Sequence, residues 1–184
     1  MTKEVIMTTA TPTPTPGRYV IDAPRSEITF TTKHLFGLGT VRGSFRLRSG
    51  TVALAEPLTG THVDAVADAA SFATGNRNRD RQVLSKALLD TENYPDIVFR
   101  AAGAELDQAG TWALQGRLTA HGVDAPVTFT VTRAEVDGDE ITVEATAIVD
   151  RYAHGVTKLK GMAARHLQLT ATIRARHGDG DHSA

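Results

Sequence analysis

Apolar and polar residues alternate along most of the chain between Gly17 and Arg176. Two sets of positions show the pattern most clearly: Ile28, Phe30, Thr32 and His34, and Val41, Gly43, Phe45 and Leu47. A period of two is typical of a strand with one buried face. About nine such segments follow one another. The links are short, and Asp137-Gly138 favours a hairpin, so the pattern predicts an all-β antiparallel fold.

One segment, 78–89, has helical periodicity. Its apolar residues share one face: Val83, Leu84, Ala87 and Leu88. Asn78 or Asp80 is the expected N-cap. Because one short helix cannot cover a large open sheet, the strands must close into a barrel or pair into a sandwich, and we favour the barrel.

The interior of such a barrel would contain several small residues. These are Gly43, Ala65, Ala67, Ala69, Gly116, Ala145 and Ala147. An eight-stranded barrel is wide enough to be filled by side chains or to hold a small ligand. Since aromatic residues make up only 5% of the chain, the small residues indicate either an apolar cavity or places where strands kink and pack closely.

The composition is that of one soluble domain and excludes several functions. The chain has 184 residues and no cysteine, so thiol nucleophiles and cysteine-ligated metals are excluded. Lys and Arg number 20 against 21 Asp and Glu, a balance that gives no overall field for nucleic acid. No stretch approaches the roughly 20 apolar residues of a membrane span. We therefore expect neither a nucleic-acid partner nor a transmembrane segment.

The two ends of the chain differ from the body. Residues 1–16 are rich in Thr and Pro and are expected to be a disordered leader. They lack the apolar stretch of a secretory signal, so a cytoplasmic location is expected. Residues 177–184 are expected to be a flexible tail, which leaves 17–176 as the folded domain.

Motifs for catalysis are scarce. The sequence has no Gly-x-Ser-x-Gly, Walker or His-Glu-x-x-His motif. An enzyme acting on a lipophilic substrate would need two or more separated histidines to converge, the candidates being His34, His121, His154 and His166. The arginines of the segment 76–81 are compatible with an anion site at a helix N-terminus or with an internal Arg79–Asp80 arrangement.

Several short segments together resemble one family. They are Tyr19-Val20-Ile21-Asp22, Ser26-Glu27-Ile28-Thr29-Phe30, Lys33-His34, Val41-Arg42-Gly43-Ser44-Phe45, Thr74-Gly75 with Arg79-Asp80, Tyr94-Pro95-Asp96-Ile97-Val98-Phe99, and Gly116-Arg117-Leu118-Thr119 with Gly122-Val123 and Pro126-Val127. Their order and spacing over about 17–176 are similar to those of the YceI-like family of polyisoprenoid-binding proteins.

The resemblance implies a lipocalin-like antiparallel barrel of eight strands around a long apolar pocket, occupied in family members by an isoprenoid chain. One of the nine segments is then a flanking or split strand. After Arg79-Asp80 the chain lacks the histidine and paired phenylalanines common in the family, so the helix at the pocket has less bulk. Asp150-Arg151-Tyr152-Ala153-His154-Gly155 only loosely matches the family's Arg-aromatic-Gly element.

The function expected from this resemblance is to carry or store a polyprenyl lipid or isoprenoid quinone without catalysis and without any other cofactor. The expected pocket wall is Ile28, Phe30, Phe45, Leu47, Leu84, Leu88, Phe99, Trp112, Leu114, Leu118, Phe129, Val143 and Leu169. The expected polar rim is His34 and Arg79. A histidine- or metal-dependent enzyme, and a stress or interaction protein with a filled barrel, are the alternatives. The outer faces are compatible with a homodimer.

Overall fold

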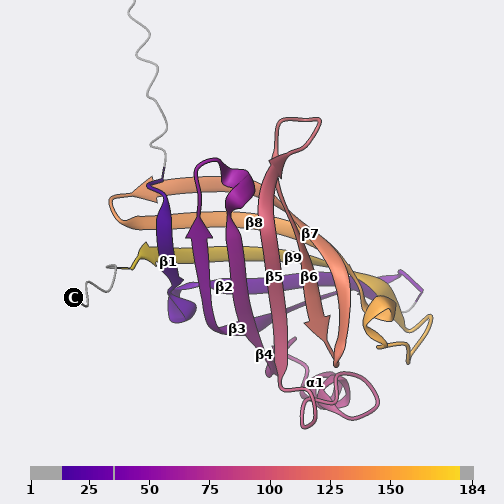
Figure 1. The fold of residues 1–184 in the computed structure, drawn as a ribbon. Helices are drawn as coiled ribbons and strands as arrows, with labels where there is room; N and C mark the ends of the chain where they lie inside the picture. The colour runs from indigo at the N-terminus through magenta and orange to yellow at the C-terminus, as the bar shows by residue number, and fades with distance from the viewer. Residues whose placement is uncertain (1–13, 35, 179–184) are drawn as a thin grey trace, which may run out of the picture.

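The computed structural model describes residues 14–34 and 36–178. These residues contain one antiparallel sheet (Figure 1). Its strands are β1 (Gly17–Ile21), β2 (Glu27–His34), β3 (Gly39–Leu54), β4 (His62–Ala73), β5 (Asp96–Leu106), β6 (Trp112–Ala120), β7 (Val123–Asp137), β8 (Glu140–Asp150) and β9 (Ala163–His177). Each strand from β2 to β9 pairs with the next along the chain, and β2 also pairs with β9. The sheet is therefore closed into a barrel.

The first two strands occupy one position in this barrel. Both β1 and β2 pair with β3 on one side and with β9 on the other. The short 3-10 helix η1 (Ala23–Arg25) separates them. The barrel thus has eight strand positions, and the split strand expected from the sequence is confirmed.

The helix is shorter than expected and begins earlier. α1 spans Arg77–Leu84, and its N-cap is Asn76, whose side chain accepts a hydrogen bond from the Arg79 N–H at 3.1 Å. Asp80 does not cap the helix; its carboxylate accepts hydrogen bonds from the N–H and hydroxyl of Thr74, at the end of β4. After Ser85 the chain continues in turns, which still bury Leu88.

The inward faces agree with the alternation in the sequence. On β2 and β3 the positions 28, 30, 32, 34, 41, 45 and 47 all face the interior. The register Phe30↔Gly43 and Ile28↔Phe45 sets these faces side by side. Asp64 and Asp68 lie on the opposite face of β4, where they pair with Arg100 and Arg48.

A well-packed cluster occupies one half of the barrel, which we call the closed half. It consists of Tyr19, Ile21, Leu47, Ala67, Ile141 and Ala175, of which Leu47 and Ala67 lie at the border with the other half and also line the cavity described below. Tyr19 is 2% exposed, packs edge-on against His177 with ring centroids 4.9 Å apart, and donates a hydrogen bond to the Thr15 carbonyl. This half also holds the β7–β8 hairpin, which turns at 138–139 as expected.

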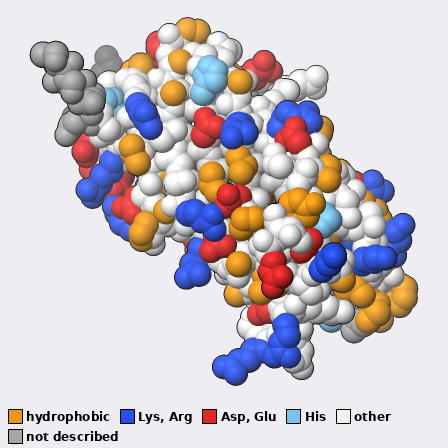
Figure 2. All heavy atoms as spheres, turned by 60° about the horizontal axis from the view of Figure 1, so that its bottom comes forward, with side chains coloured by type: hydrophobic (Ala, Val, Ile, Leu, Met, Phe, Trp, Pro, Cys, Tyr) orange, Lys and Arg blue, Asp and Glu red, His pale blue; other side chains and the backbone are white. Residues whose placement is uncertain are grey.

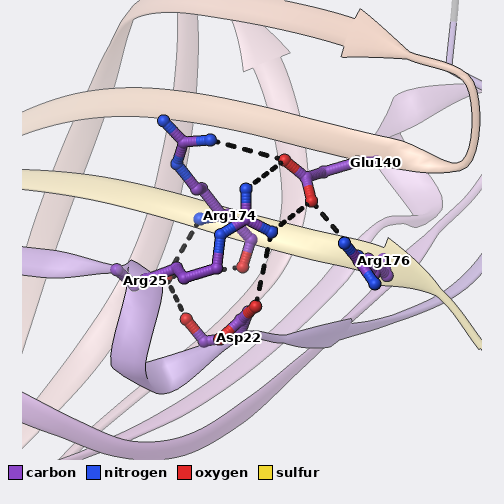
Figure 3. Close-up of polar contacts among 6 residues, drawn as sticks. Asp22, Arg25, Glu140, Arg174 and Arg176 are labelled. Atoms are coloured by element: carbon purple, nitrogen blue, oxygen red, sulfur yellow. Dashed lines mark hydrogen bonds and ion pairs between the residues drawn. The ribbon is translucent and has the colours of Figure 1, made fainter.

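A cluster of ion pairs covers the outside of the closed half (Figure 3). Glu140 accepts hydrogen bonds from Arg25, Arg174 and Arg176, and Arg25 also pairs with Asp22. These contacts join β8 to η1 and β9. The Arg25 and Arg176 guanidinium groups lower the pKa of the Glu140 carboxyl from 4.5 to about 2.

The expected leader and tail fall largely outside the described residues, which exclude 1–13 and 179–184. β9 continues through His177, one residue beyond the expected end of the domain, because His177 pairs with Tyr19. The cytoplasmic location depends on the leader and stays a prediction.

Candidate ligand-binding cavity

The other half of the barrel, which we call the open half, contains a cavity of about 370 Å³. It is lined by residues of every strand from β2 to β9, of α1 and the turns that follow it, and of the β8–β9 connection. Lys33, Gln82 and Met162 line the cavity and are also exposed to solvent. The cavity therefore reaches the surface between these residues, which define its mouth.

Most of the expected pocket residues line this cavity. They are Ile28, Phe30, His34, Phe45, Leu47, Arg79, Leu88, Phe99, Leu118, Phe129 and Leu169. Their role in holding a ligand stays a prediction.

Four expected wall residues lie elsewhere: Leu84, Trp112, Leu114 and Val143. Trp112 and Leu114 are at the start of β6 and Val143 is near the start of β8, in the closed half. Leu84 packs against the cluster of Phe30, Val41 and Phe72 behind the cavity wall. Alternation assigns a side chain to the inward face but does not tell how far along the barrel it lies, which explains the differences for the three strand residues.

Two glycines of the barrel wall lie directly against aromatic rings that fill part of the interior. A Cβ on Gly43 would lie 2.4 Å from the Phe30 ring, and one on Gly116 would lie 2.6 Å from the Phe99 ring. Phe30 stacks on Phe72 with centroids 5.2 Å apart. These glycines therefore serve close packing.

The inward alanines divide between the two expectations. Ala65 and Ala67 line the cavity and so provide space, whereas Ala145 and Ala147 are buried outside its lining. Both interpretations of the small residues thus hold, at different positions of the barrel. The barrel is filled in its closed half and hollow in its open half.

The polar residues that line the cavity are either basic or neutral. Lys33, Arg79 and Arg151 line it together with His34 and His154, and none of the described lining residues is Asp or Glu. Thr32 and Gln82 are the neutral polar members. Such a lining offers hydrogen-bond donors and positive charge to a bound group.

Arg79 is the charged residue that the helix presents to the cavity. Its Nε donates to the Thr74 hydroxyl at 2.8 Å, and Asp80 is also held by Thr74. Within the described residues, no ion pair joins Arg79 to an acidic side chain. The internal arrangement expected for Arg79 and Asp80 therefore exists through Thr74, and the terminal nitrogens of Arg79 remain available to the cavity.

Arg151 organises the connection between β8 and β9. Its side chain is 9% exposed and donates to four backbone carbonyls at 2.5–2.8 Å. The accepting residues are Val156, Lys158, Ala163 and Ala164. Burial lowers the pKa of the guanidinium from its ordinary value. These bonds fix the loop that carries Leu159 and Met162 at the mouth.

Of the four histidines considered for catalysis, two line the cavity and two do not. His34 and His154 both line the cavity, and a ring nitrogen of His154 lies 3.0 Å from the Val123 carbonyl. His121 instead packs against Tyr94, with centroids 4.9 Å apart. In residues 14–34 and 36–178, no group of three or more His, Asp or Glu has the arrangement of a metal site.

Other lining residues were not expected from the sequence. They include Phe72, Val83, Leu89, Arg151, His154, Leu159, Met162 and Leu167. Leu167 follows the alternation of β9, so this signal was present, whereas Phe72 is out of phase with Ala65 and Ala67 on β4, where the pairing with β3 shifts register. The β8–β9 connection has no periodicity, and its place at the cavity depends on the long-range bonds of Arg151.

None of the helices in the described part of the chain has the length and apolar character needed to cross a membrane.

A closed eight-position barrel with an apolar cavity in one half is the architecture of a lipocalin-like binding protein. The model of the YceI-like domain family matches residues 19–175. The chain therefore belongs to the YceI-like family, and the resemblance found in the sequence is confirmed.

Relatives and solved structures agree with this assignment. A UPF0312 protein of Vibrio campbellii is 29% identical over 114 residues, and one of Pseudomonas syringae pv. tomato is 30% identical over 118. Each match spans about 60% of the relative's length.

Among solved structures, Burkholderia cenocepacia BcnA has a TM-score of 0.71 at 21% identity, covering 84% of this chain and 98% of its own. A polyisoprenoid binding domain from Saccharophagus degradans has a TM-score of 0.67 at 16% identity, covering 87% of this chain and 98% of its own. These likenesses establish the fold.

Proposed function

We propose that this protein binds one long isoprenoid chain in the open half of the barrel and carries or stores it without changing it chemically. The observation that supports this most is the apolar cavity itself, which reaches the surface at the mouth. The Saccharophagus degradans neighbour, described as a polyisoprenoid binding domain, agrees with the proposal.

The driving force is the removal of apolar surface from water. Burial contributes roughly 25 cal/mol per Å², so several prenyl units offset the entropy lost when the chain becomes ordered. The aromatic walls formed by Phe30, Phe45 and Phe99 are already packed in place. A preformed site lowers the cost of binding.

The mouth would recognise a head group rich in hydrogen-bond acceptors. Arg79, His34 and Gln82 line the cavity beside the opening, and no acidic side chain joins them in the described lining. Phosphate oxygens of a polyprenyl phosphate and carbonyl oxygens of a quinone both fit this chemistry, and phosphate would gain more from the charge of Arg79.

The proposal can be tested with two matched tryptophan variants. Leu169 lines the cavity, whereas the neighbouring Gln168 is exposed on the outer face of β9. We expect Leu169→Trp to abolish uptake of added undecaprenol and Gln168→Trp to retain it, as measured by native mass spectrometry. Organic extraction of the natively purified wild-type protein should release a prenyl lipid or quinone. A wild-type protein that is empty and takes up no undecaprenol would overturn the proposal.

A further inference from the structure

Two neighbouring loops at the mouth expose large hydrophobic side chains. Phe36 and Leu38, between β2 and β3, are 83% and 90% exposed, and Met162, before β9, is 55% exposed. Other large exposed hydrophobics, such as Val20, Leu106 and Ile148, lie on separate strands. Scattered single residues are normal on a soluble protein, but a group on adjoining loops marks an interaction surface.

The structure fixes the two loops to each other. The Phe36 N–H donates to the Gly161 carbonyl at 2.9 Å. Gly161 has a φ of +82°, and a Cβ there would lie 2.6 Å from the Phe36 ring. Arg151 holds the rest of the β8–β9 connection through its four backbone acceptors. The hydrophobic side chains are thus presented together from a preorganised surface.

Positive charge surrounds these side chains. The sequence has no Asp or Glu in 33–42 or in 151–178. Lys33, Arg42, Lys158 and Lys160 are exposed, and none of them forms an ion pair within the described part of the chain. Figure 2 shows hydrophobic side chains gathered beside Lys and Arg at the right-hand end, where the β2–β3 and β8–β9 connections lie in Figure 1.

The connections at the other end of the barrel have a different character. Exposed acidic residues occur there, namely Glu56, Asp107, Asp137 and Asp139. An anionic surface would therefore attract the β2–β3 and β8–β9 connections and be repelled by these acidic residues, so the charges favour docking through those two connections.

We propose that the mouth docks on the surface of an anionic lipid bilayer. Phe36, Leu38 and Met162 insert at the boundary between head groups and acyl chains, while Lys33, Lys158 and Lys160 contact the head groups. Lys33, Leu159 and Met162 also line the cavity, so docking places its opening against the membrane. Docking in this orientation would let an isoprenoid chain pass directly from the bilayer into the cavity. This role of docking rests on the function proposed above.

The test measures binding to vesicles by co-sedimentation. Vesicles of phosphatidylcholine alone are compared with an equal mixture of phosphatidylcholine and phosphatidylglycerol. We expect the wild-type protein to bind the mixed vesicles, and Phe36→Ser/Leu38→Ser to lower the partition coefficient by about ten-fold or more. Leu106→Ser, at an exposed hydrophobic residue of the other end, is the matched control and should bind like the wild type.

The contribution of charge is tested separately. Lys158→Glu/Lys160→Glu should weaken binding to the mixed vesicles, and added salt should weaken binding of the wild type, because screening reduces surface attraction. None of the four residues changed in the two double variants lines the cavity. Phe36→Ser/Leu38→Ser and Lys158→Glu/Lys160→Glu should therefore still take up undecaprenol from detergent micelles.

The outcomes separate docking from cavity binding. Leu169→Trp should bind vesicles normally while failing to take up undecaprenol. If the wild-type protein takes up no undecaprenol but binds vesicles through the mouth, the docking proposal stands and the proposed function fails. Absence of vesicle binding by the wild type, or equal binding by Phe36→Ser/Leu38→Ser, would overturn the docking proposal. It would also be overturned by a dimer in sedimentation velocity that this double variant loses, because the surface would then be an interface between two copies.

Discussion

In the closed half of the barrel, Tyr19, Ile21 and Ala175 are at most 6% exposed and pack against one another. In the open half, the same strands leave about 370 Å³ between rings such as Phe30 and Phe99. Ion pairs around Glu140 reinforce the outside of the closed half, whereas the mouth carries cations without acidic partners in the described residues. The comparison indicates that one half provides stability and the other provides the cavity in which we propose that a ligand binds.

The two halves differ in the segments that contribute to their interiors. β1 and η1 lie at the closed half and contribute Tyr19 and Ile21 to its interior. The open half is covered by α1 and the β8–β9 connection, whose residues stand around the cavity and do not fill it. The same alternating strands can therefore surround a packed core or a cavity, depending on these short segments.

The largest expected effect concerns packing in the closed half. Ile141 is 6% exposed within the cluster, so Ile141→Ala should lower the free energy of unfolding by about 2–5 kcal/mol. Leu167→Ala, in the cavity wall, should lower it by about 1–2 kcal/mol, because this side chain borders empty space. Urea unfolding of the ligand-free proteins measures both. Equal losses would remove the distinction between the halves.

The second effect concerns Arg151. Arg151→Met should lower the free energy of unfolding by about 2 kcal/mol, because buried carbonyls that now accept from the guanidinium lose their donor. Hydrogen exchange in residues 156–164 should be faster in the variant than in the wild type, whereas exchange in β1 should change less. Unchanged exchange in this loop would mean that Arg151 does not hold the mouth in place.

A smaller effect is expected for head-group recognition at the mouth. Arg79→Leu should weaken binding of undecaprenyl phosphate by about ten-fold, because one charge-assisted interaction is lost, and should leave binding of undecaprenol nearly unchanged. Arg81→Leu is the control, since Arg81 lies on the same helix but is exposed outside the cavity lining. An equal loss for both lipids would show that Arg79 shapes the cavity and does not recognise the head group.

The smallest effect is the pH dependence of Glu140. Its pKa falls from 4.5 to about 2 on folding. The carboxylate therefore stabilises the protein fully above pH 4.5 and loses this contribution as the pH falls through about 2. Glu140→Gln should be less stable than wild type at neutral pH, and the difference should shrink across this range. Urea midpoints measured at several pH values check the expectation, which a constant difference would contradict.

The sequence predicts which face of a strand is buried better than it predicts position along the barrel. Phe30 and Phe45 were assigned correctly to the interior because side chains alternate strictly. Trp112, Leu114 and Val143 are on the expected face of their strands but in the closed half. Depth depends on strand stagger and on what closes each end, and local periodicity contains neither.

The mouth was the least predictable part of the site. Arg79 was identified because it belongs to a dense polar segment before the helix, but the helix ends at Leu84 and not at Leu89. Arg151 and Met162 were not identified, since Arg151 and Ala164 lie 13 positions apart in the sequence and come together only through hydrogen bonds formed in the fold. Alternation and the single short helix favoured a barrel over a sandwich, and the family resemblance favoured a cavity over a filled interior.

The central claim is that the open half holds an apolar chain and the closed half does not. Methyl-labelled protein titrated with undecaprenol and followed by NMR tests it most directly. The account predicts that the methyl signals of Val83, Leu89, Leu167 and Leu169, which line the cavity, shift or broaden, while those of Ile21 and Ile141 stay in place. Shifts centred on Ile21 and Ile141, or no shifts at saturating undecaprenol, would contradict it.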